Sequence, residues 1–145
     1  MAIAIRILGE RLASDVAPLA EAAERDGYSH ISRLVEEWES GSNRFNKSGE
    51  MLLGAFDGPS IIAIGGMTIE LSRSDWLRMR RFYVLPDFRG RGIARLLASR
   101  LLAHARGYAP TVTVHAGDAR AALFWQAMGF RPFVRDTYTH ILDFA

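Results

Sequence analysis

The sequence contains no cysteine, and this absence excludes several kinds of chemistry. Without thiols the chain forms no disulfide framework, no thiolate metal site and no cysteine nucleophile. It also lacks any apolar run near the roughly 20 residues that a membrane-spanning helix needs. Residues 1–6 are typical of a strand, because they lack the basic start and long apolar stretch of a secretory signal. We therefore expect a protein of the reducing cytoplasm that has no membrane partner.

Apolar residues make up 49% of the 145 residues and aromatic residues 10%, which is enough to fill a core and excludes a disordered chain. The length suits one compact domain and leaves no room for a second of ordinary size. We therefore expect residues 1–145 to form a single domain.

The positive charge is concentrated in one segment. The formal charge of the chain is only +2, but residues 78–95 contain six arginines and one aspartate and carry +5, so the rest carries −3. The charged residues of this segment are Arg78, Arg80, Arg81, Asp87, Arg89, Arg91 and Arg95. A local excess of this size predicts an anionic ligand at this part of the chain.

Hydrophobic periodicity predicts alternating strands and helices. The predicted strands are 3–8, 51–56, 61–70, 76–85, 111–115, 131–134 and 138–144. The predicted helices are one after a cap at Ser14 or Asp15, then 29–39, 90–106 and one from Asp118 to Met128, with a polar surface loop at 40–49. The segment 76–115 is a βαβ unit, whose strands should pair in parallel. The expected fold class is α+β (loosely α/β), a mixed, mostly antiparallel sheet with helices on both faces.

The segment 83–94 runs from strand to proline, glycine turn and helix start. Gly90 and Gly92 allow a tight turn and let an anion approach the backbone N–H groups. The first helical turn has unpaired donors that suit a phosphate or pyrophosphate, and Arg89 and Arg91 add guanidinium groups. The plain alternative is a basic helix terminus with solvated arginines.

Two other phosphate-binding motifs are excluded. A P-loop requires glycine followed by lysine and serine or threonine, and this segment has no lysine. The dinucleotide fingerprint requires glycine or alanine where Arg95 stands.

The segment resembles the acetyl-CoA motif of the GNAT superfamily of N-acyltransferases, Arg/Gln-x-x-Gly-x-Gly/Ala. Arg89, Gly92 and Ala94 match it in register, with Val84 and Pro86 upstream. A second family motif is matched in part by Asp118, Ala121, Phe124, Trp125, Gly129 and Phe130. The motif similarity covers about residues 76–133, and the order of elements agrees along the whole chain.

The resemblance implies an acetyl-CoA-dependent N-acetyltransferase with no metal, which acts directly on a primary amine of a small molecule or peptide. It implies that backbone N–H groups of Arg89, Gly90, Arg91, Gly92, Ile93 and Ala94 hold the CoA pyrophosphate. It also implies that the strand of Phe82 and Val84 separates from its parallel neighbour, which exposes backbone groups to pantetheine and the acetyl carbonyl. Asp118 and Trp125 complete the implied cofactor contacts.

The chain departs from the family pattern at three positions. Trp125 stands where many relatives have a tyrosine that protonates the leaving thiolate, and it can equally be a core residue. Asp118 replaces asparagine and can be a plain helix cap. Arg78 occupies the position of a common glutamate base, and Glu70 is a poor substitute because it lies about 25 Å along the hairpin from Val84.

Catalytic candidates are His115, His140 and Tyr138, near the ends of the last strands. A histidine pKa suits base chemistry, although a structural role fits either histidine better. Neither His30 nor His104 has an acidic partner at a ligand-like spacing, so no metal site is predicted.

Two alternatives to the enzyme remain open. The first is a module that binds CoA or acyl-CoA with little turnover, which Trp125 and Arg78 favour. The second is a nucleic-acid binder that uses the arginine-rich segment. An alternating strand would place those arginines on both faces, and no recognition helix is evident, so nucleic acid is disfavoured. Edge strands at the chain's end would permit a homodimer.

Overall fold

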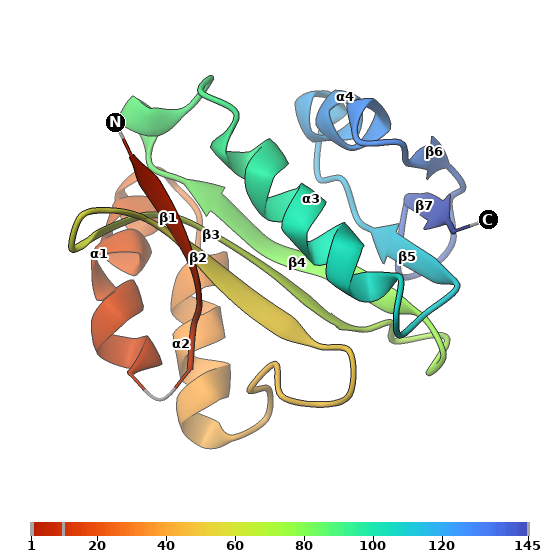
Figure 1. Cartoon of the computed structure of the whole chain (residues 1–145), viewed down its shortest axis with the longest axis horizontal. Coiled ribbons are helices and arrows are strands. Elements are labelled where there is room, and N and C mark those ends of the chain that lie inside the picture. Colours follow the sequence, from red (N-terminus) through yellow and green to blue (C-terminus); the bar gives the residue numbers. More distant parts are fainter. Residues whose placement is uncertain (1, 10, 145) are drawn as a thin grey trace.

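A computed structural model describes residues 2–9 and 11–144, which form one mixed sheet of seven strands in the order β1-β2-β3-β4-β5-β7-β6 (Figure 1). The strands are β1 (Ile3–Ile7), β2 (Met51–Asp57), β3 (Ser60–Ile69), β4 (Leu77–Val84), β5 (Thr111–Val114), β6 (Arg131–Pro132) and β7 (His140–Asp143). β4 and β5 are parallel, and every other neighbouring pair is antiparallel. The predicted fold class is confirmed.

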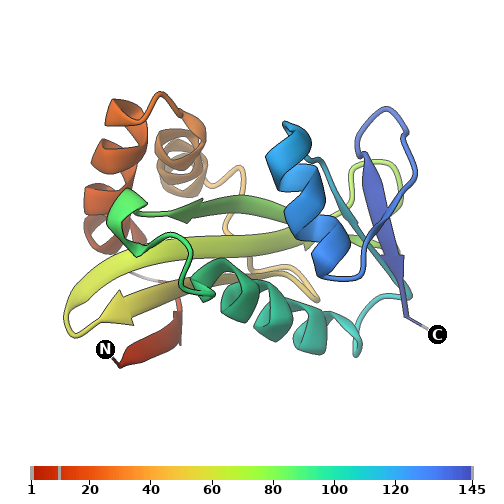
Figure 2. The ribbon, with the colours of Figure 1, turned by 90° about the horizontal axis from the view of Figure 1, so that it is seen from above.

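Helices cover both faces of the sheet, as expected. The helices are α1 (Leu12–Arg25), α2 (His30–Ser40), α3 (Ile93–Ala105) and α4 (Ala119–Ala127), with a short 3-10 turn, η1, at Pro86–Phe88. α1 and α2 lie together on one face and α3 lies on the other (Figure 2). Within the described ranges, no helix combines the length and the apolar character that crossing a bilayer requires.

The two faces of the sheet bury separate hydrophobic clusters because strand side chains alternate between them. The first cluster includes Leu19 of α1 and Leu34 of α2. The second includes Leu97 and Leu101 of α3, together with Trp125 of α4. β4 contributes side chains to both clusters, so it packs against the helices on both faces of the sheet.

Several predicted boundaries were wrong for local reasons. The third helix begins at Ile93 and not at residue 90, because Gly90 and Gly92 have φ values of +77° and +78°, outside the right-handed helical region. The last two strands are shorter than 131–134 and 138–144, although the Phe133 and Arg135 N–H groups still donate to the Thr139 and Tyr138 carbonyls. α1 begins earlier, at Leu12.

The loop at residues 41–49 is not wholly a surface loop. Phe45 is buried in the α1–α2 cluster. A Cβ atom at Gly66 would lie only 2.6 Å from the Phe45 ring, so the missing side chain of Gly66 makes room for it. The aromatic ring anchors the middle of an otherwise polar segment.

Candidate functional site

β4 and β5 separate soon after they meet. Their parallel ladder consists of the pairs Leu77–Val112 and Arg78–Thr113, and beyond these β4 continues to Val84 without a β5 partner. The separation expected from the sequence is therefore present. It leaves residues 79–84 without a ladder partner on the β5 side, where an extended ligand could pair with the backbone groups that no side chain engages. The Phe82 and Val84 carbonyls are already engaged, by His30 and Arg89.

The open part of β4 contains a bulge. The ladder between β3 and β4 shifts in register between Ile64 and Gly66, and Arg81 takes a left-handed φ of +64°. A Cβ atom at Gly65 would lie 2.8 Å from the Phe82 ring, so the ring occupies the space above this glycine. The bulge also turns the Phe82 carbonyl out of the ladder, where it accepts a hydrogen bond from His30 Nε2 at 2.9 Å.

The glycine turn follows η1 and precedes α3. A Cβ atom at Gly90 or Gly92 would meet nothing within 4 Å, so the turn is open on its outer side. Gly92 is the N-cap of α3 and has no side chain to accept from the first-turn N–H groups. These amides are free in the way an anion site requires, and the helix dipole favours negative charge there.

Arg89 is engaged within the protein. Its Nε donates to the Val84 carbonyl at 2.9 Å, and its Nη2 forms a 2.6 Å ion pair with Asp26 at the end of α1. This hydrogen bond raises the pKa of Arg89 and holds the pKa of Asp26 below its usual value. The Tyr83 hydroxyl also donates to Asp26, at 3.2 Å. Arg89 thus joins α1 to the glycine turn, a contact that the sequence did not reveal.

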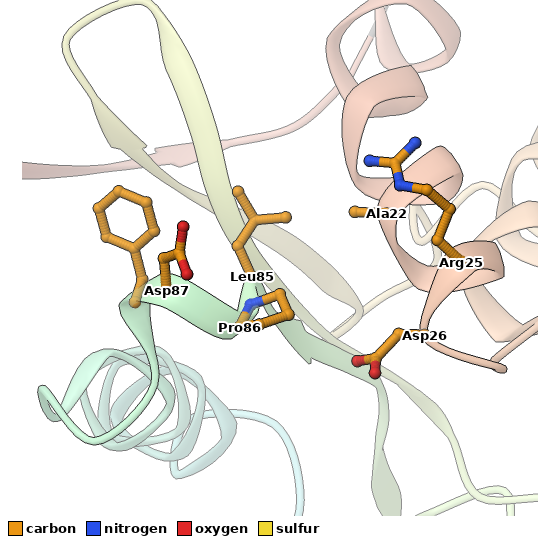
Figure 3. A pocket seen from close by; sticks show the side chains of 7 residues that line it. Ala22, Arg25, Asp26, Leu85, Pro86 and Asp87 are labelled. Carbon is orange, nitrogen blue, oxygen red and sulfur yellow. The ribbon is translucent and has the colours of Figure 1, made fainter.

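A shallow pocket of about 360 Å³ lies between the end of α1 and the segment that follows β4. Its lining residues are Ala22, Arg25, Asp26, Leu85, Pro86, Asp87 and Phe88. Arg25 and Asp26 face Leu85 and Pro86 across the opening (Figure 3). The pocket adjoins the glycine turn on its α1 side and is distinct from the gap between β4 and β5.

Trp125 and Asp118 both have clear structural roles. Trp125 is only 5% exposed and makes edge contacts with the rings of Phe82, Phe124 and Phe130. The Asp118 carboxylate accepts a 2.8 Å hydrogen bond from the Ala121 amide and caps α4, as predicted. Contact of either residue with a cofactor stays a prediction.

The catalytic candidates lie around the pairing of β5 with β7, where Val114 is opposite His140. His140 is 6% exposed, with Nδ1 2.7 Å from Thr139 Oγ1 and Nε2 3.2 Å from the Gln126 amide nitrogen, so both ring nitrogens are occupied. Tyr138 is buried against Trp76, and His115 is exposed. Among the described residues, no hydrogen bond or ring contact joins any of the three candidates to the bulge.

Glu70 is a structural carboxylate. It is 1% exposed and accepts hydrogen bonds from Ser72, Thr113 and Thr137. Burial raises the pKa of this carboxyl, but the hydrogen bonds from Ser72 and Thr137 outweigh burial and lower it overall. In the hairpin register, β3 ends near Leu77 while Val84 pairs with Ala63, so Glu70 is far from the open end of β4, as expected.

His30 is a site residue that the sequence analysis missed. It begins α2 and contacts Phe82, which lies 52 residues later in the chain. Burial lowers the pKa of His30, the hydrogen bond to Phe82 partly opposes this, and the charge of Arg81 lowers it further. No sequence pattern links the two positions. In the part of the chain that the structure describes, no group of three or more histidine, aspartate or glutamate side chains is placed to hold a metal ion.

Comparison with known proteins gives a consistent result. The family model of the GNAT acetyltransferases matches residues 13–130, whereas no curated protein matches the chain. A candidate acetyltransferase from Exiguobacterium sp. 255-15 is 24% identical, with a TM-score of 0.88 over 99% of this chain and 94% of that one.

Two further solved structures have the same fold at lower identity. A GNAT family acetyltransferase from Brucella melitensis, solved in complex with acetyl-CoA, is 22% identical, with a TM-score of 0.75 over 99% of this chain and 89% of that one. An acetyltransferase from Thermus thermophilus is 14% identical, with a TM-score of 0.76 over 99% and 98%. With the family model matching most of its length, the chain belongs to the GNAT acetyltransferase family.

Proposed function

We propose that this protein transfers the acetyl group of acetyl-CoA directly to a primary amine of a small molecule or peptide. The observation that carries the proposal is the separation of β4 from β5 after Arg78, next to a glycine turn with open amides. Together these features offer an extended ligand a backbone edge to pair with and an anion site at its phosphate end. The Brucella relative solved with acetyl-CoA supports this choice of donor.

The residues present fit such a donor. Backbone N–H groups of the glycine turn and of the first turn of α3 would hold the pyrophosphate, because the left-handed glycines shape an open turn there. The Arg89 N–H is not among them, since it donates to the Pro86 carbonyl. The unpaired edge of β4 up to Val84 would hold the pantetheine amides. N–H groups near the bulge would polarise the acetyl carbonyl, and one donor aimed at the developing oxyanion is worth about 3 kcal/mol.

The reaction needs little further chemistry from the chain. The neutral amine nitrogen attacks the carbonyl carbon, the carbon–sulfur bond breaks, CoA leaves as the thiolate, and the proton lost from the nitrogen passes to solvent. A thiol pKa of about 8.5 makes the thiolate an acceptable leaving group near neutral pH, so the buried indole of Trp125 need not act as an acid. His30 serves as a positioning residue, because its hydrogen bond fixes the Phe82 carbonyl at the bulge.

A second candidate function is a CoA-binding module with little turnover. It is favoured by the burial of Trp125 and by the two occupied ring nitrogens of His140, which leave no evident acid or base at these positions.

Two measurements test the candidates, and the second separates them. Isothermal titration with acetyl-CoA should show binding in either case, and the absence of binding rejects both. Thiol release with a panel of primary amines should exceed the rate without amine if the protein is an acetyltransferase. Binding without amine-dependent release would favour the module.

A further inference from the structure

A cluster of arginines lies on the face of β4 that is turned toward α2. Leu77 and Met79 belong to the core on the α3 side. Side chains alternate along a strand, so Arg78 and Arg80 point to the opposite face. Arg81 joins them because the bulge reverses the alternation, and its guanidinium bonds Glu37 of α2 at 2.8 Å. The expectation that these arginines would divide between the two faces was wrong for this reason.

Positive charge in this cluster exceeds negative charge. Arg33 of α2 also interacts with Arg80, which gives four cations that face Glu37 and Glu70. Both acids are already engaged. Glu37 pairs with Arg81, and the Glu70 carboxylate accepts from Ser72, Thr113 and Thr137.

The Arg78 and Arg80 side chains have no bonded anionic partner, although the charges of Glu70 and Glu37 act on them from a distance. Neither side chain forms a hydrogen bond or an ion pair with any residue that the structure describes. The Nε–H of Arg78 is buried and has no acceptor. Both side chains are half-buried, and burial lowers the pKa of each guanidinium. The charge of Glu70 partly opposes this at Arg78, while the charge of Arg81 lowers both pKa values further. Half-buried, unpaired guanidinium groups next to like charges are expensive unless an anion joins them.

The phosphates of the proposed donor do not account for this cluster. They would lie beyond the far end of β4, at the glycine turn, and Arg78 is about 20 Å along the strand from Val84. Arg80, in contrast, is two residues from Phe82, or about 7 Å along the strand. Arg78 itself is in the last pair before β4 and β5 separate. Arg80 is therefore within reach of a small acceptor whose amine approaches the bulge, and Arg78 lies two residues further along the same face of the strand.

We propose that the amine acceptor carries an anionic group, a carboxylate or a phosphate, which Arg78 and Arg80 bind on the α2-facing side of β4. The inference rests on the proposed acetyltransferase function and specifies its substrate class. Guanidinium forks match both anions in geometry. The anion is held without covalent change while the amine reacts at the thioester.

Matched amines test the proposal. β-Alanine is compared with β-alaninamide for the carboxylate, and O-phosphoethanolamine with ethanolamine for the phosphate. Each pair is assayed by thiol release in the wild type, in Arg78→Gln and Arg80→Gln, and in Arg100→Gln. Arg100 is exposed on α3, so this control removes the same charge on the opposite face of the sheet.

The wild type should prefer the charged member of at least one pair, and the pair identifies the anion. Arg78→Gln and Arg80→Gln should reduce that preference in kcat/KM about ten- to a hundredfold, mainly through KM, because each loses a charge-assisted hydrogen bond. Arg100→Gln should retain the wild-type preference for the charged amine. The preference is the ratio of kcat/KM for the charged amine to that for the uncharged amine. Differences in the intrinsic reactivity of the two amines cancel when this ratio is compared between variants. Equal use of charged and uncharged amines, or a preference that survives both substitutions, overturns the inference and leaves the acetyltransferase proposal standing.

A direct measurement covers the case of no turnover. The Arg78 Nε–Hε signal, assigned by its loss in Arg78→Gln, is followed by NMR while β-alanine or O-phosphoethanolamine is added to the CoA-loaded protein. A saturable shift of this signal supports the anion site, and its absence with both ligands rejects the site. Failure of acetyl-CoA to bind or react with any amine would instead reject the proposed function.

Discussion

The two ends of β4 are built in opposite ways. At its start, Leu77 and Arg78 are held by ladders on both sides, with β3 on one edge and β5 on the other. At its end, from the bulge at Arg81 to Val84, only β3 pairs with the strand, and the register is shifted. One strand therefore supplies a rigid base and an open backbone edge, which is what a site for an extended ligand requires.

Side chains replace the missing ladder at the open end. The Phe82 ring packs against Trp125, and the Phe82 carbonyl accepts from His30. The Val84 carbonyl accepts from Arg89. At the closed end, Glu70 instead joins the end of β3 to β5 and to the segment before β7. The comparison shows that backbone pairing and side-chain contacts stabilise different halves of one strand.

The largest expected effect is at the open end. Trp125→Ala removes a ring that fills the space between α4 and Phe82. The cavity should lower the free energy of unfolding by about 3–5 kcal/mol in urea denaturation. Leu123→Ala is the control, because Leu123 lies on the same helix and is 68% exposed. Similar losses in both variants would show that the aromatic cluster does not hold the open end together.

The next effect is at the closed end. Glu70→Gln removes a buried carboxylate that accepts hydrogen bonds from Ser72, Thr113 and Thr137. This substitution should lower the free energy of unfolding by about 2 kcal/mol at pH 7. The folded pKa of Glu70 is lowered, so the carboxylate stabilises the protein above its unfolded pKa of about 4.5 and loses this effect as the pH falls through the folded value.

Urea titrations at several pH values check this prediction. The difference in free energy of unfolding between the wild type and Glu70→Gln should become smaller below a pH of about 4.5. Glu39→Gln changes an exposed glutamate of α2 and should leave stability nearly unchanged at every pH. A gap that stays constant down to acid pH would contradict the assigned role of the Glu70 charge.

A matched glycine pair separates binding from strain. Gly92→Ala and Gly58→Ala both force alanine into a left-handed conformation, with φ of +78° and +59°, and neither new Cβ meets another atom. Each should cost about 1–2 kcal/mol of stability. Only Gly92→Ala should also weaken acetyl-CoA binding in isothermal titration, because its amide lies in the proposed anion site. Equal acetyl-CoA affinities would count against a pyrophosphate at the glycine turn.

The smallest expected effect concerns His30. Its folded pKa is lowered, so the neutral ring stabilises the fold above an unfolded pKa of about 6.5, and this contribution is lost as the pH falls. His30→Gln keeps a donor for the Phe82 carbonyl but cannot titrate. Between pH 7.5 and pH 5 the free energy of unfolding of the wild type should fall slightly more than that of the variant. His115→Gln, an exposed change, should follow the wild type.

Local sequence signals predicted much of the fold and part of the site. The order of elements, the βαβ unit and the Asp118 cap were confirmed, because each depends on periodicity or on contacts within a few residues. The glycine turn was also predicted correctly, since positive φ at Gly90 and Gly92 follows from their missing Cβ atoms. The helix that follows was placed three residues too early for the same reason.

The remaining features depend on contacts between distant parts of the chain. Arg89 was predicted as a phosphate ligand, but its ion pair with Asp26 spans 63 residues. The His30 contact with Phe82 spans 52 residues, and the bulge that enables it requires Gly65 of the neighbouring strand. Alternation along β4 placed Arg81 on the wrong face because the bulge is a property of two strands together.

The amino-acid sequence by itself determined the family, the glycine turn and the excess of positive charge along β4. Tertiary structure alone decided which arginines form an ion pair and which have no bonded partner, because Glu37 and Glu70 approach the cluster from α2 and from the end of β3. Charge compensation depends on distances of a few ångströms in space. The linear order of residues does not contain these distances until the sheet and its helices have packed.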